Sequence, residues 1–366
     1  MKEKKRRYYR FYVLCTLCSL FILSLLTSSQ SNVNKPVKQG QQYKDGNLLF
    51  PFNVSYPQLA IPVNISDYMI QIAKIKSSSP SLYLKNEHIY KAIDDWINRS
   101  LGTDEFSKVG LKSYEMSGQD GYGNVHMTGY YTPIIKARHE LTTDFKYPIY
   151  KMPVSEGKQL PNREQIYNGI LANKGLEIAY SNSLIDNFIM EVQGSAYVDF
   201  EDDLPLVFFS YGGKNGHGYS SIGRLLVEQG EIEKEKMSIQ AIKDWAKNKS
   251  EEKIKELLVQ NHSFVFFEPK YNTEVKGAAN VPLIANASIA SDKSLIPMGS
   301  VVLVDVPLLD SDGQYRGRRE NRLMVALDVG GAIKGQHFDL YLGVGDQPGK
   351  LAGYYNHYGR AWLLKP

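Results

Sequence analysis

Two aspartates in the C-terminal part of the chain, Asp328 and Asp339, occupy positions that few folds accommodate. Asp328 follows the apolar run 323–327, which predicts a buried strand, and Asp339 lies inside a second short predicted strand, Phe338–Tyr341. Aspartate is disfavoured in strands and costly to bury without partners. Because a glycine-bearing loop joins the two strands, the pattern indicates a carboxylate held in a cleft for chemistry. The alternative is a pair of turn aspartates that bind backbone N–H groups.

Composition places these aspartates in a protein rich in β structure. The length of 366 residues predicts two domains. The chain contains 25 Tyr and 30 Gly, and this mixture is typical of strands that are joined by many turns. Tyrosine also combines an apolar ring with a polar hydroxyl, which suits carbohydrate sites.

Apolar spacing predicts helices near the start of the chain and strands after residue 111. Ile65–Ile75 has a serine capping signal and helical spacing, and a second helix is predicted at 86–97 with a core-facing stripe. Two further helices are predicted at 236–249 and 251–260. Strands are predicted at 125–131, 148–150, 176–179, 206–209, 264–267, 281–284, 301–306, 323–327, 338–341 and 360–364. Asp310–Gly313 predicts a hairpin turn.

Net charge argues against a nucleic-acid partner. The whole chain carries a formal charge of +4. The first ten residues contain six Lys or Arg and one Glu, a net +5, which leaves −1 for residues 11–366. A chain that is nearly neutral outside its first ten residues has no electrostatic footprint for nucleic acid.

The N-terminal segment 1–30 predicts export. Its basic start precedes the apolar run Phe11–Leu26 and then small polar residues, which is typical of a secretory signal, although an uncleaved anchor stays open. Residues 31–48 are mostly polar and predict a linker. Both cysteines, Cys15 and Cys18, lie inside the apolar run, so no disulfide framework is expected beyond it.

Several segments in one order resemble a known family, the membrane-bound lytic murein transglycosylases A, over roughly Gly40 to Pro366. The matching segments are Gly129–Pro133, Val192–Ser195, Gly213–Gly216, Ser221–Gly223, Gly277–Pro282, Ala290–Pro297 and Asp328–Asp339. The sequence departs from the family at the membrane anchor, because members are typically lipidated on a cysteine just after the apolar run. Cys15 and Cys18 each follow leucine within that run, so the lipid anchor stays open.

The predicted elements favour a mainly β fold with a few helices, and the resemblance implies its topology, which those elements alone do not specify. A double-psi β-barrel domain would comprise residues 49–132 and 261–366, and a smaller β-barrel domain, residues 133–260, would be inserted into it. The groove between them would hold the glycan, and ligand sites do favour domain interfaces.

The resemblance also implies a peptidoglycan lytic transglycosylase, which cleaves the glycan strand without water. One acid donates a proton to the leaving oxygen and then accepts one from the 6-hydroxyl of the muramic acid. Asp339 matches the family's catalytic aspartate, and its apolar neighbours Phe338 and Leu340 are expected to raise its pKa. Asp328 is the second catalytic candidate, because its charge would help to keep Asp339 protonated. A turn residue that orders Gly330–Gly331 is an equal alternative.

Further residues are candidates for binding the substrate, each with a structural alternative. The tyrosines of the predicted strand at 125–131 fit a groove wall or an ordinary strand, the Gly213–Gly216 segment fits a glycan contact or a turn, and Lys334 fits a sugar contact or a solvated loop. The candidates are Gly129, Tyr130, Tyr131, Thr132, Gln193, Gly194, Ser195, Lys214, Asn215 and Lys334. The Gly213–Gly216 segment lacks the spacing of a phosphate loop, which excludes nucleotide binding there.

No cofactor or metal is expected, since the seven histidines have no metal-ligand spacing. His337 lies two residues from Asp339, so it would point to the same side of a strand and could touch the site.

The expected partners are peptidoglycan strands, a membrane through the N-terminal segment, and complexes of cell-wall synthesis or division. The expected location is the periplasm at the outer membrane. A two-aspartate murein hydrolase and a non-catalytic murein-binding protein are the alternative functions.

Overall fold

The computed structural model describes residues 42–44, 47–50, 61–154, 157, 159–310 and 312–366. The predicted signal segment 1–30 lies outside these residues. Within the predicted linker 31–48 the structure has β1 (Gln42–Lys44), which pairs antiparallel with β2 (Asn47–Phe50). Polar composition did not indicate this hairpin, because backbone hydrogen bonds between the strands need no apolar periodicity. Among the described residues, no helix has the length and apolarity that a membrane crossing requires.

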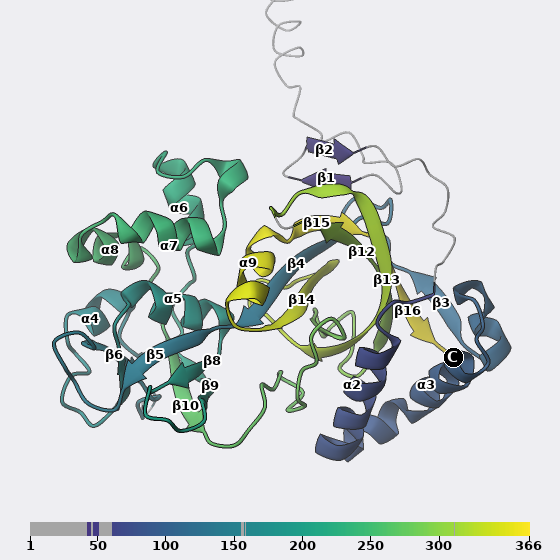
Figure 1. Ribbon diagram of the computed structural model, residues 1–366, viewed down its shortest axis with the longest axis horizontal. Coiled ribbons are helices and arrows are strands. Elements are labelled where there is room, and N and C mark those ends of the chain that lie inside the picture. Colours follow the sequence, from purple (N-terminus) through teal and green to yellow (C-terminus); the bar gives the residue numbers. More distant parts are fainter. Residues whose placement is uncertain (1–41, 45–46, 51–60, 155–156, 158, 311) are drawn as a thin grey trace, which may run out of the picture. The chain divides into compact units, whose positions relative to one another are not determined.

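The larger of two main sheets has eight strands in the order β15-β4-β14-β11-β13-β12-β16-β3 (Figure 1). Its strands are β3 (Lys112–Glu115), β4 (Val125–Thr132), β11 (Ser288–Ala290), β12 (Val301–Leu309), β13 (Tyr315–Asp328), β14 (His337–Val344), β15 (Asn356–Gly359) and β16 (Ala361–Lys365). The pairs β4–β14 and β11–β13 are parallel, whereas the other neighbours are antiparallel. The predicted turn at Asp310–Gly313 joins β12 to β13, where Gly313 N–H donates to the Asp310 carbonyl.

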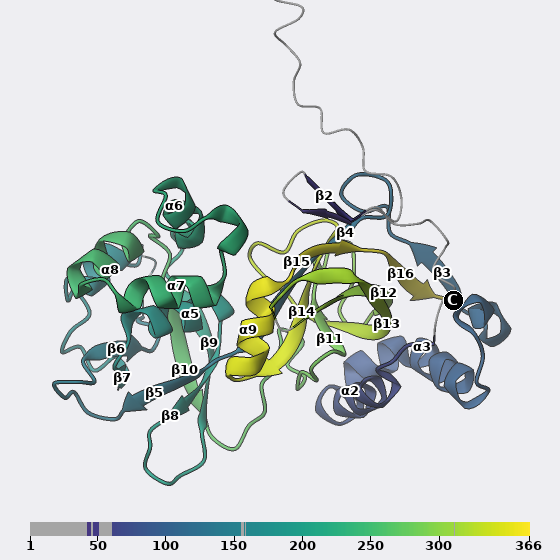
Figure 2. The same cartoon turned by 45° about the horizontal axis from the view of Figure 1, so that its top comes forward.

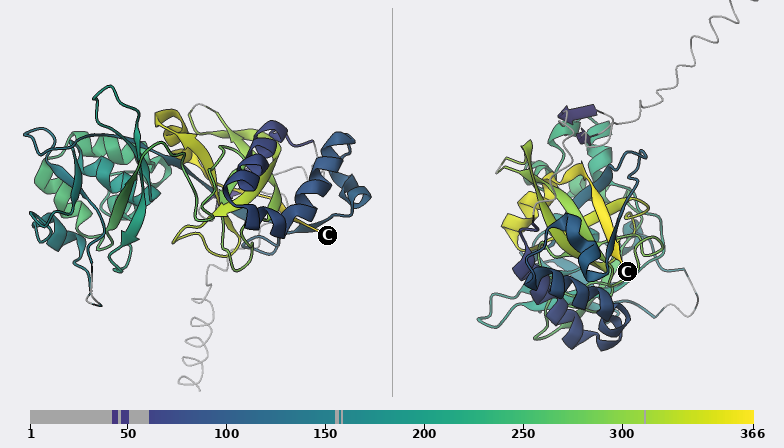
Figure 3. Two further views of the ribbon diagram at one scale, coloured as in Figure 1. Left: turned by 90° about the horizontal axis from the view of Figure 1, so that it is seen from below. Right: turned by 90° about the vertical axis from the view of Figure 1, so that its right-hand side faces the viewer.

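The two faces of this sheet are packed into different clusters, as strand alternation requires. In β12, Val302, Val304 and Val306 belong to one cluster, and Val301 and Leu303 belong to the other. The second cluster also contains the predicted core stripe Ile89, Ile93 and Trp96. That stripe lies on α3 (Pro80–Asn98), which with α2 (Ile65–Ser78) covers this face of the sheet (Figures 2 and 3).

The smaller sheet has six strands in the order β10-β9-β8-β5-β7-β6. Its strands are β5 (Ile134–Arg138), β6 (Tyr147–Tyr150), β7 (Glu177–Ser181), β8 (Ala196–Asp199), β9 (Val207–Lys214) and β10 (Val265–Lys270), and the same part of the chain contains α4 (Arg163–Tyr167), α5 (Leu184–Gln193), α6 (Ile222–Glu228), α7 (Ile239–Lys247) and α8 (Glu251–Leu258). Strand β10 pairs with β9 although it lies beyond residue 260, where we placed the end of the insert.

The fold class is therefore confirmed as mainly β, with two main sheets and several helices. Four predicted helices are present, and α2 ends at Ser78, just before Pro80 begins α3. The predicted strand 281–284 is wrong, because Pro282 makes only an isolated bridge to Lys276. Not predicted were the helices α4, α5, α6 and α9 (Asp346–Tyr354) and the 3-10 turns η1 (Thr103–Val109) and η2 (Lys234–Lys236).

Candidate active site

The two predicted aspartates lie on either side of one short strand. β11 is hydrogen-bonded to β13 on one side and to β14 on the other, and Ala290 is the register partner of both Asp328 and Asp339. On the other side of β14, Thr128 of β4 is the register partner of Asp339, and Asn356 of β15 follows it. Five strands thus carry one row of residues across the larger sheet, in the order Asp328, Ala290, Asp339, Thr128 and Asn356.

Asp339 has a carboxyl group that can hold or release a proton near neutral pH. Its Oδ1 accepts a hydrogen bond of 2.7 Å from Thr128 Oγ1. Burial raises the pKa of Asp339 to about 7; the Thr128 hydroxyl opposes this rise and the charge of Asp328 adds to it. We expected the rise from Phe338 and Leu340, but both side chains are buried in the core on the opposite face of β14. These two side chains therefore do not surround the carboxyl.

Asp328 is held by three hydrogen bonds. Its Oδ1 accepts from the backbone N–H groups of Ala278 and Val329, each at 2.9 Å. Its Oδ2 accepts from the Tyr130 hydroxyl at 3.0 Å. Burial raises the pKa of Asp328, and these donors act in the opposite direction. Asp328 therefore orders the segment at Ala278 and the start of the β13–β14 loop, and it also lies close enough to act on Asp339.

Two histidines complete the polar cluster. His337 lies on the face of β14 that carries Asp339, as predicted, and its Nε2 is 2.9 Å from Thr128 Oγ1. The ring of His126 stacks on that of His337 with 4.3 Å between ring centroids, and its Nε2 is 2.7 Å from Asn356 Oδ1. Burial, followed by the neighbouring His126, lowers the pKa of His337 to about 4. Thr128, His126 and Asn356 were not among the predicted site residues.

The predicted residues of β4 differ in how much of them is accessible. Tyr130 is half-buried, and its ring lies against Tyr341 with 5.2 Å between centroids. Tyr131 is buried, and a Cβ added at Gly349 would come within 2.5 Å of its ring. Thr132 is buried and its hydroxyl lies 3.1 Å from the Tyr341 hydroxyl. Tyr130 is therefore the tyrosine of this pair that reaches the aspartate cluster.

Gly129 and the predicted segment 193–195 fix the course of the backbone near β4. Gly129 is closely packed, since a Cβ there would lie 3.2 Å from the backbone of Ala352. Gln193 ends α5, and its Oε1 accepts a hydrogen bond of 3.0 Å from the N–H of Tyr131. Gly194 follows with φ of 80°, a left-handed conformation that favours glycine. This cap turns the chain so that Ser195, which is half-buried, leads into β8.

The predicted residues Lys214, Asn215 and Lys334 lie in loops or at strand ends. Lys214 and Lys334 are exposed. Asn215 is buried, and its Nδ2 donates to the carbonyls of Pro161 and His262 at 3.0 and 2.9 Å. These bonds hold three chain segments together, which is a structural reason for an asparagine at this position.

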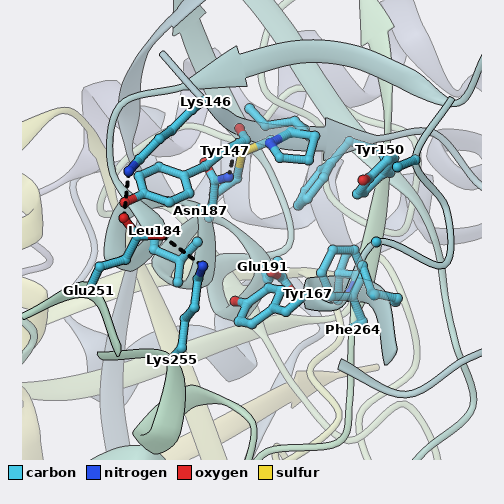
Figure 4. Close-up of a pocket in the computed structure, with 18 residues that line it drawn as sticks. Lys146, Tyr147, Tyr150, Tyr167, Leu184, Asn187, Glu191, Glu251, Lys255 and Phe264 are labelled. Atoms are coloured by element: carbon cyan, nitrogen blue, oxygen red, sulfur yellow. Dashed lines mark hydrogen bonds and ion pairs between the residues drawn. The ribbon is translucent and has the colours of Figure 1, made fainter. Parts of the chain in front are cut away.

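A cavity of about 320 Å³ lies in the part of the molecule that contains the smaller sheet (Figure 4). Tyr147, Asn187 and Phe264 are among its lining residues, and the ion pairs of Glu251 with Lys146 and Lys255 lie on one side. None of the predicted site residues lines it. Within the described ranges, no group of three or more His, Cys, Asp or Glu is arranged to hold a metal ion.

Comparison with known proteins relates both parts of the chain to one group of proteins. Residues 126–268 match the MltA specific insert domain, and residues 287–365 match the 3D domain. The membrane-bound lytic murein transglycosylase A of Escherichia coli is 53% identical over 334 residues, which are 91% of this chain and 91% of that protein. The protein of the same name from Vibrio cholerae is 41% identical over 342 residues, 93% of this chain and 92% of that protein.

A solved structure supports the same relation. The crystal structure of E. coli MltA with bound chitohexaose matches the present structure with a TM-score of 0.82 and 52% identity. The match covers 90% of this chain and 99% of that chain. The predicted aspartates Asp328 and Asp339, with His337 and Asn356, lie in the part that matches the 3D domain, whereas His126 and Thr128 lie at the start of the part that matches the MltA specific insert domain.

Proposed function

Because this chain belongs to the membrane-bound lytic murein transglycosylase A family, we propose that it cleaves murein glycan strands with Asp339 as its single acid and base. The bond cleaved joins N-acetylmuramic acid to N-acetylglucosamine. One observation carries the residue assignment: Asp339 is a carboxyl group with a pKa raised to about 7, so both of its protonation states are populated near neutral pH.

The reaction returns Asp339 to its starting state without water. The protonated carboxyl donates its proton to the glycosidic oxygen, and the bond between this oxygen and C1 of the muramic acid breaks. The 6-hydroxyl oxygen of the same sugar forms a new bond to C1, and the proton of that hydroxyl goes to the Asp339 carboxylate. The products are a free 4-hydroxyl and a 1,6-anhydro end, and the enzyme is again in its acid form.

Asp328 supports this chemistry from the far side of β11. Its negative charge raises the pKa of Asp339, after the larger effect of burial. Its hydrogen bonds from Ala278, Val329 and the Tyr130 hydroxyl hold the surroundings in place. We assign it an electrostatic and orienting role, in which it need not exchange a proton with the substrate.

The proposed substrate is the peptidoglycan strand, and the chitohexaose bound to the E. coli relative is a glycan of related form. Tyr130, Gln193, Ser195, Lys214 and Lys334 retain some accessible surface for sugar contacts. Gly129, Tyr131, Thr132, Gly194 and Asn215 would act by shaping the backbone around the strand. We place residues 49–132 and 261–366 in the catalytic domain and 133–260 in the insert, with β10 pairing with the insert strands.

Two observations support a cellular setting at a membrane: the relatives' name, membrane-bound, and the basic and apolar N-terminal segment. We propose an exported protein that acts in the periplasm at the outer membrane and associates with the membrane through this segment. Complexes with cell-wall synthesis or division proteins are a further expectation.

The test compares the full chain with Asp339→Asn, which keeps the size and the hydrogen-bond capacity of the side chain. Purified murein sacculi are incubated with each protein, and both soluble muropeptides and sedimented protein are measured. The proposal predicts release by the wild type, loss of at least about 10³-fold in Asp339→Asn, and equal sedimentation of both with sacculi. Equal release by both proteins would exclude Asp339 as catalyst, and sedimentation without release by either would indicate a murein-binding protein.

A further inference from the structure

A line of polar groups extends behind Asp339, away from Asp328. Asp339 Oδ1 is 2.7 Å from Thr128 Oγ1, and Thr128 Oγ1 is 2.9 Å from His337 Nε2. Thr128 and His337 belong to adjacent parallel strands whose register places His337 beside His126 and Asp339 beside Thr128. The two distances are normal for hydrogen bonds. The single hydroxyl of Thr128 thus lies between a carboxyl group and an imidazole.

A threonine hydroxyl has one proton to donate, so it donates to only one of these neighbours at a time. The Ala332 backbone also hydrogen-bonds the His337 imidazole and raises its pKa, which is the effect of a carbonyl acceptor. Since Nε2 faces Thr128, the nitrogen left for the Ala332 carbonyl is Nδ1. A neutral imidazole that donates from Nδ1 has an unprotonated Nε2, which can only accept.

We propose that His337 is a positioning residue whose Nε2 accepts the Thr128 hydroxyl proton, so that the Thr128 oxygen accepts the acidic proton of Asp339. This inference rests on the proposed function, because it explains how the acid form of Asp339 is stabilised until its proton turns from Thr128 to the glycosidic oxygen. His337 itself does not touch the substrate. Its effect is transmitted by the direction in which the Thr128 hydroxyl points.

The direction of the hydroxyl changes with each half of the reaction. Once Asp339 has given its proton to the leaving oxygen, the Thr128 hydroxyl turns to donate to the carboxylate, and Nε2 of His337 loses its donor. When the carboxylate takes the proton of the 6-hydroxyl, Thr128 turns back and the first pattern returns. No proton enters or leaves Thr128 or His337. The hydrogen-bonded line from His337 through Thr128 to Asp339, called the relay below, therefore changes only the relative stability of the acid and carboxylate forms of Asp339.

The low pKa of His337, about 4, agrees with this role, because it keeps the imidazole neutral and Nε2 unprotonated during catalysis. The other titratable groups near Asp339 come from three strands. They are Tyr130 and His126 on β4, Asp328 on β13, and Tyr341 on β14 itself, whereas β11 contributes none.

The test is the pKa of the Asp339 carboxyl in the full chain, measured by ¹³C NMR of Asp-labelled protein with Asp339→Asn to assign the signal. In His337→Phe the Thr128 hydroxyl has only the carboxylate to donate to, so the pKa of Asp339 is expected to fall by about one unit, a tenfold change in the ratio of the two forms. His337→Gln, whose amide oxygen can accept, is expected to restore most of the wild-type pKa. His88→Phe, at an exposed position of α3, is the matched control and should leave the pKa unchanged.

A structural role for the ring predicts another result. The phenyl ring excludes water at least as well as imidazole, so desolvation alone would leave the pKa of Asp339 unchanged or raise it; either outcome overturns the proposal. In a Thr128→Val background, His337→Phe should have no further effect on this pKa, because the connecting hydroxyl is gone. A shift that persists there would also overturn it, and this comparison remains informative if His337→Phe perturbs folding.

The NMR measurement also separates this inference from the proposed function. If Asp339→Asn keeps its activity, the catalytic assignment fails, yet the effect of His337 on the Asp339 carboxyl can still be measured. If Asp339 is the catalyst and the relay is correct, the alkaline limit of kcat moves to lower pH in His337→Phe together with the NMR titration. An unmoved titration with an intact catalyst would refute the relay alone.

Discussion

Asp328 and Asp339 flank the same residue, since Ala290 of β11 is the register partner of both. Because neighbouring strands lie about 4.8 Å apart, their Cα atoms are roughly 10 Å from each other. At this separation the charge of Asp328 still raises the pKa of Asp339, while the hydrogen bonds of each carboxylate go to different groups. We therefore propose that the pair divides its work, with Asp339 exchanging the proton and Asp328 setting the electrostatic field around it.

Asp328→Asn tests this division. The variant removes the negative charge and keeps an oxygen for the N–H groups of Ala278 and Val329, so the alkaline limit of kcat is expected to move to lower pH. We expect kcat at its optimum to fall by about 10–100-fold, well short of the loss in Asp339→Asn. Measured pH profiles of murein solubilisation check this. A loss as complete as that of Asp339→Asn would mean that both carboxyls exchange protons with the reactants.

Asp339→Asn is expected to stabilise the fold at alkaline pH while it abolishes activity. The pKa of Asp339 is raised from 3.8 to about 7, so between these values the folded chain binds more protons than the unfolded chain and stability falls as pH rises. Asparagine has no such loss. At pH 8 the variant should be more stable by up to about 4 kcal/mol, since each pKa unit corresponds to about 1.4 kcal/mol. Urea unfolding should show this difference disappearing below about pH 4, and equal stabilities at pH 8 would contradict it.

The adjacent tyrosines Tyr130 and Tyr131 are expected to differ in how much the loss of their hydroxyl groups lowers kcat/KM. Tyr130→Phe removes the hydroxyl that donates to Asp328 at 3.0 Å, so kcat/KM is expected to fall by about tenfold, close to the value of one hydrogen bond to a charged group. Tyr131→Phe changes a buried side chain away from the aspartates, and kcat/KM should stay within about twofold. Each variant is the control for the other. A larger loss in Tyr131→Phe would mean that its hydroxyl, and not its packing, serves the substrate.

The buried ion pair of Arg163 and Glu191 should contribute strongly to the stability of the part of the fold that contains the smaller sheet. Their side chains are only 1% and 5% exposed and approach to 2.8 Å, and Glu191 Oε2 also accepts from the N–H of Val265 on β10. Arg163→Met leaves a buried carboxylate without its partner and is expected to cost about 3–5 kcal/mol. The double variant with Glu191→Leu should recover much of that loss in thermal unfolding. An additive double variant would show that the pair does not act as a unit.

The sequence indicated the two aspartates of the candidate site better than it indicated their three-dimensional surroundings. Asp328 and Asp339 could be found because aspartates next to apolar strands are unusual, and the resemblance to the family is confirmed by relatives that match most of the chain. Thr128 could not be found, because it meets Asp339 across 211 residues through a parallel strand pair that local patterns do not encode. His337 was recognised from the alternation of a strand, yet its contact is with Thr128 and not with the carboxyl. Helix α5 was missed because it is only ten residues long, and a short, mostly apolar run is ambiguous between a helix and a buried strand.

The most direct test of the central claim is the mass of the sugar ends that the full chain releases from murein. Purified sacculi are digested, and the muropeptides are analysed by mass spectrometry beside a digest made by a murein hydrolase. The account predicts muramic acid ends that are lighter by one water than the hydrolytic products and that are absent after digestion with Asp339→Asn. Ends of the hydrolytic mass would contradict it, because they would require water at C1 and a second carboxylate, with Asp328 as the candidate, to activate it.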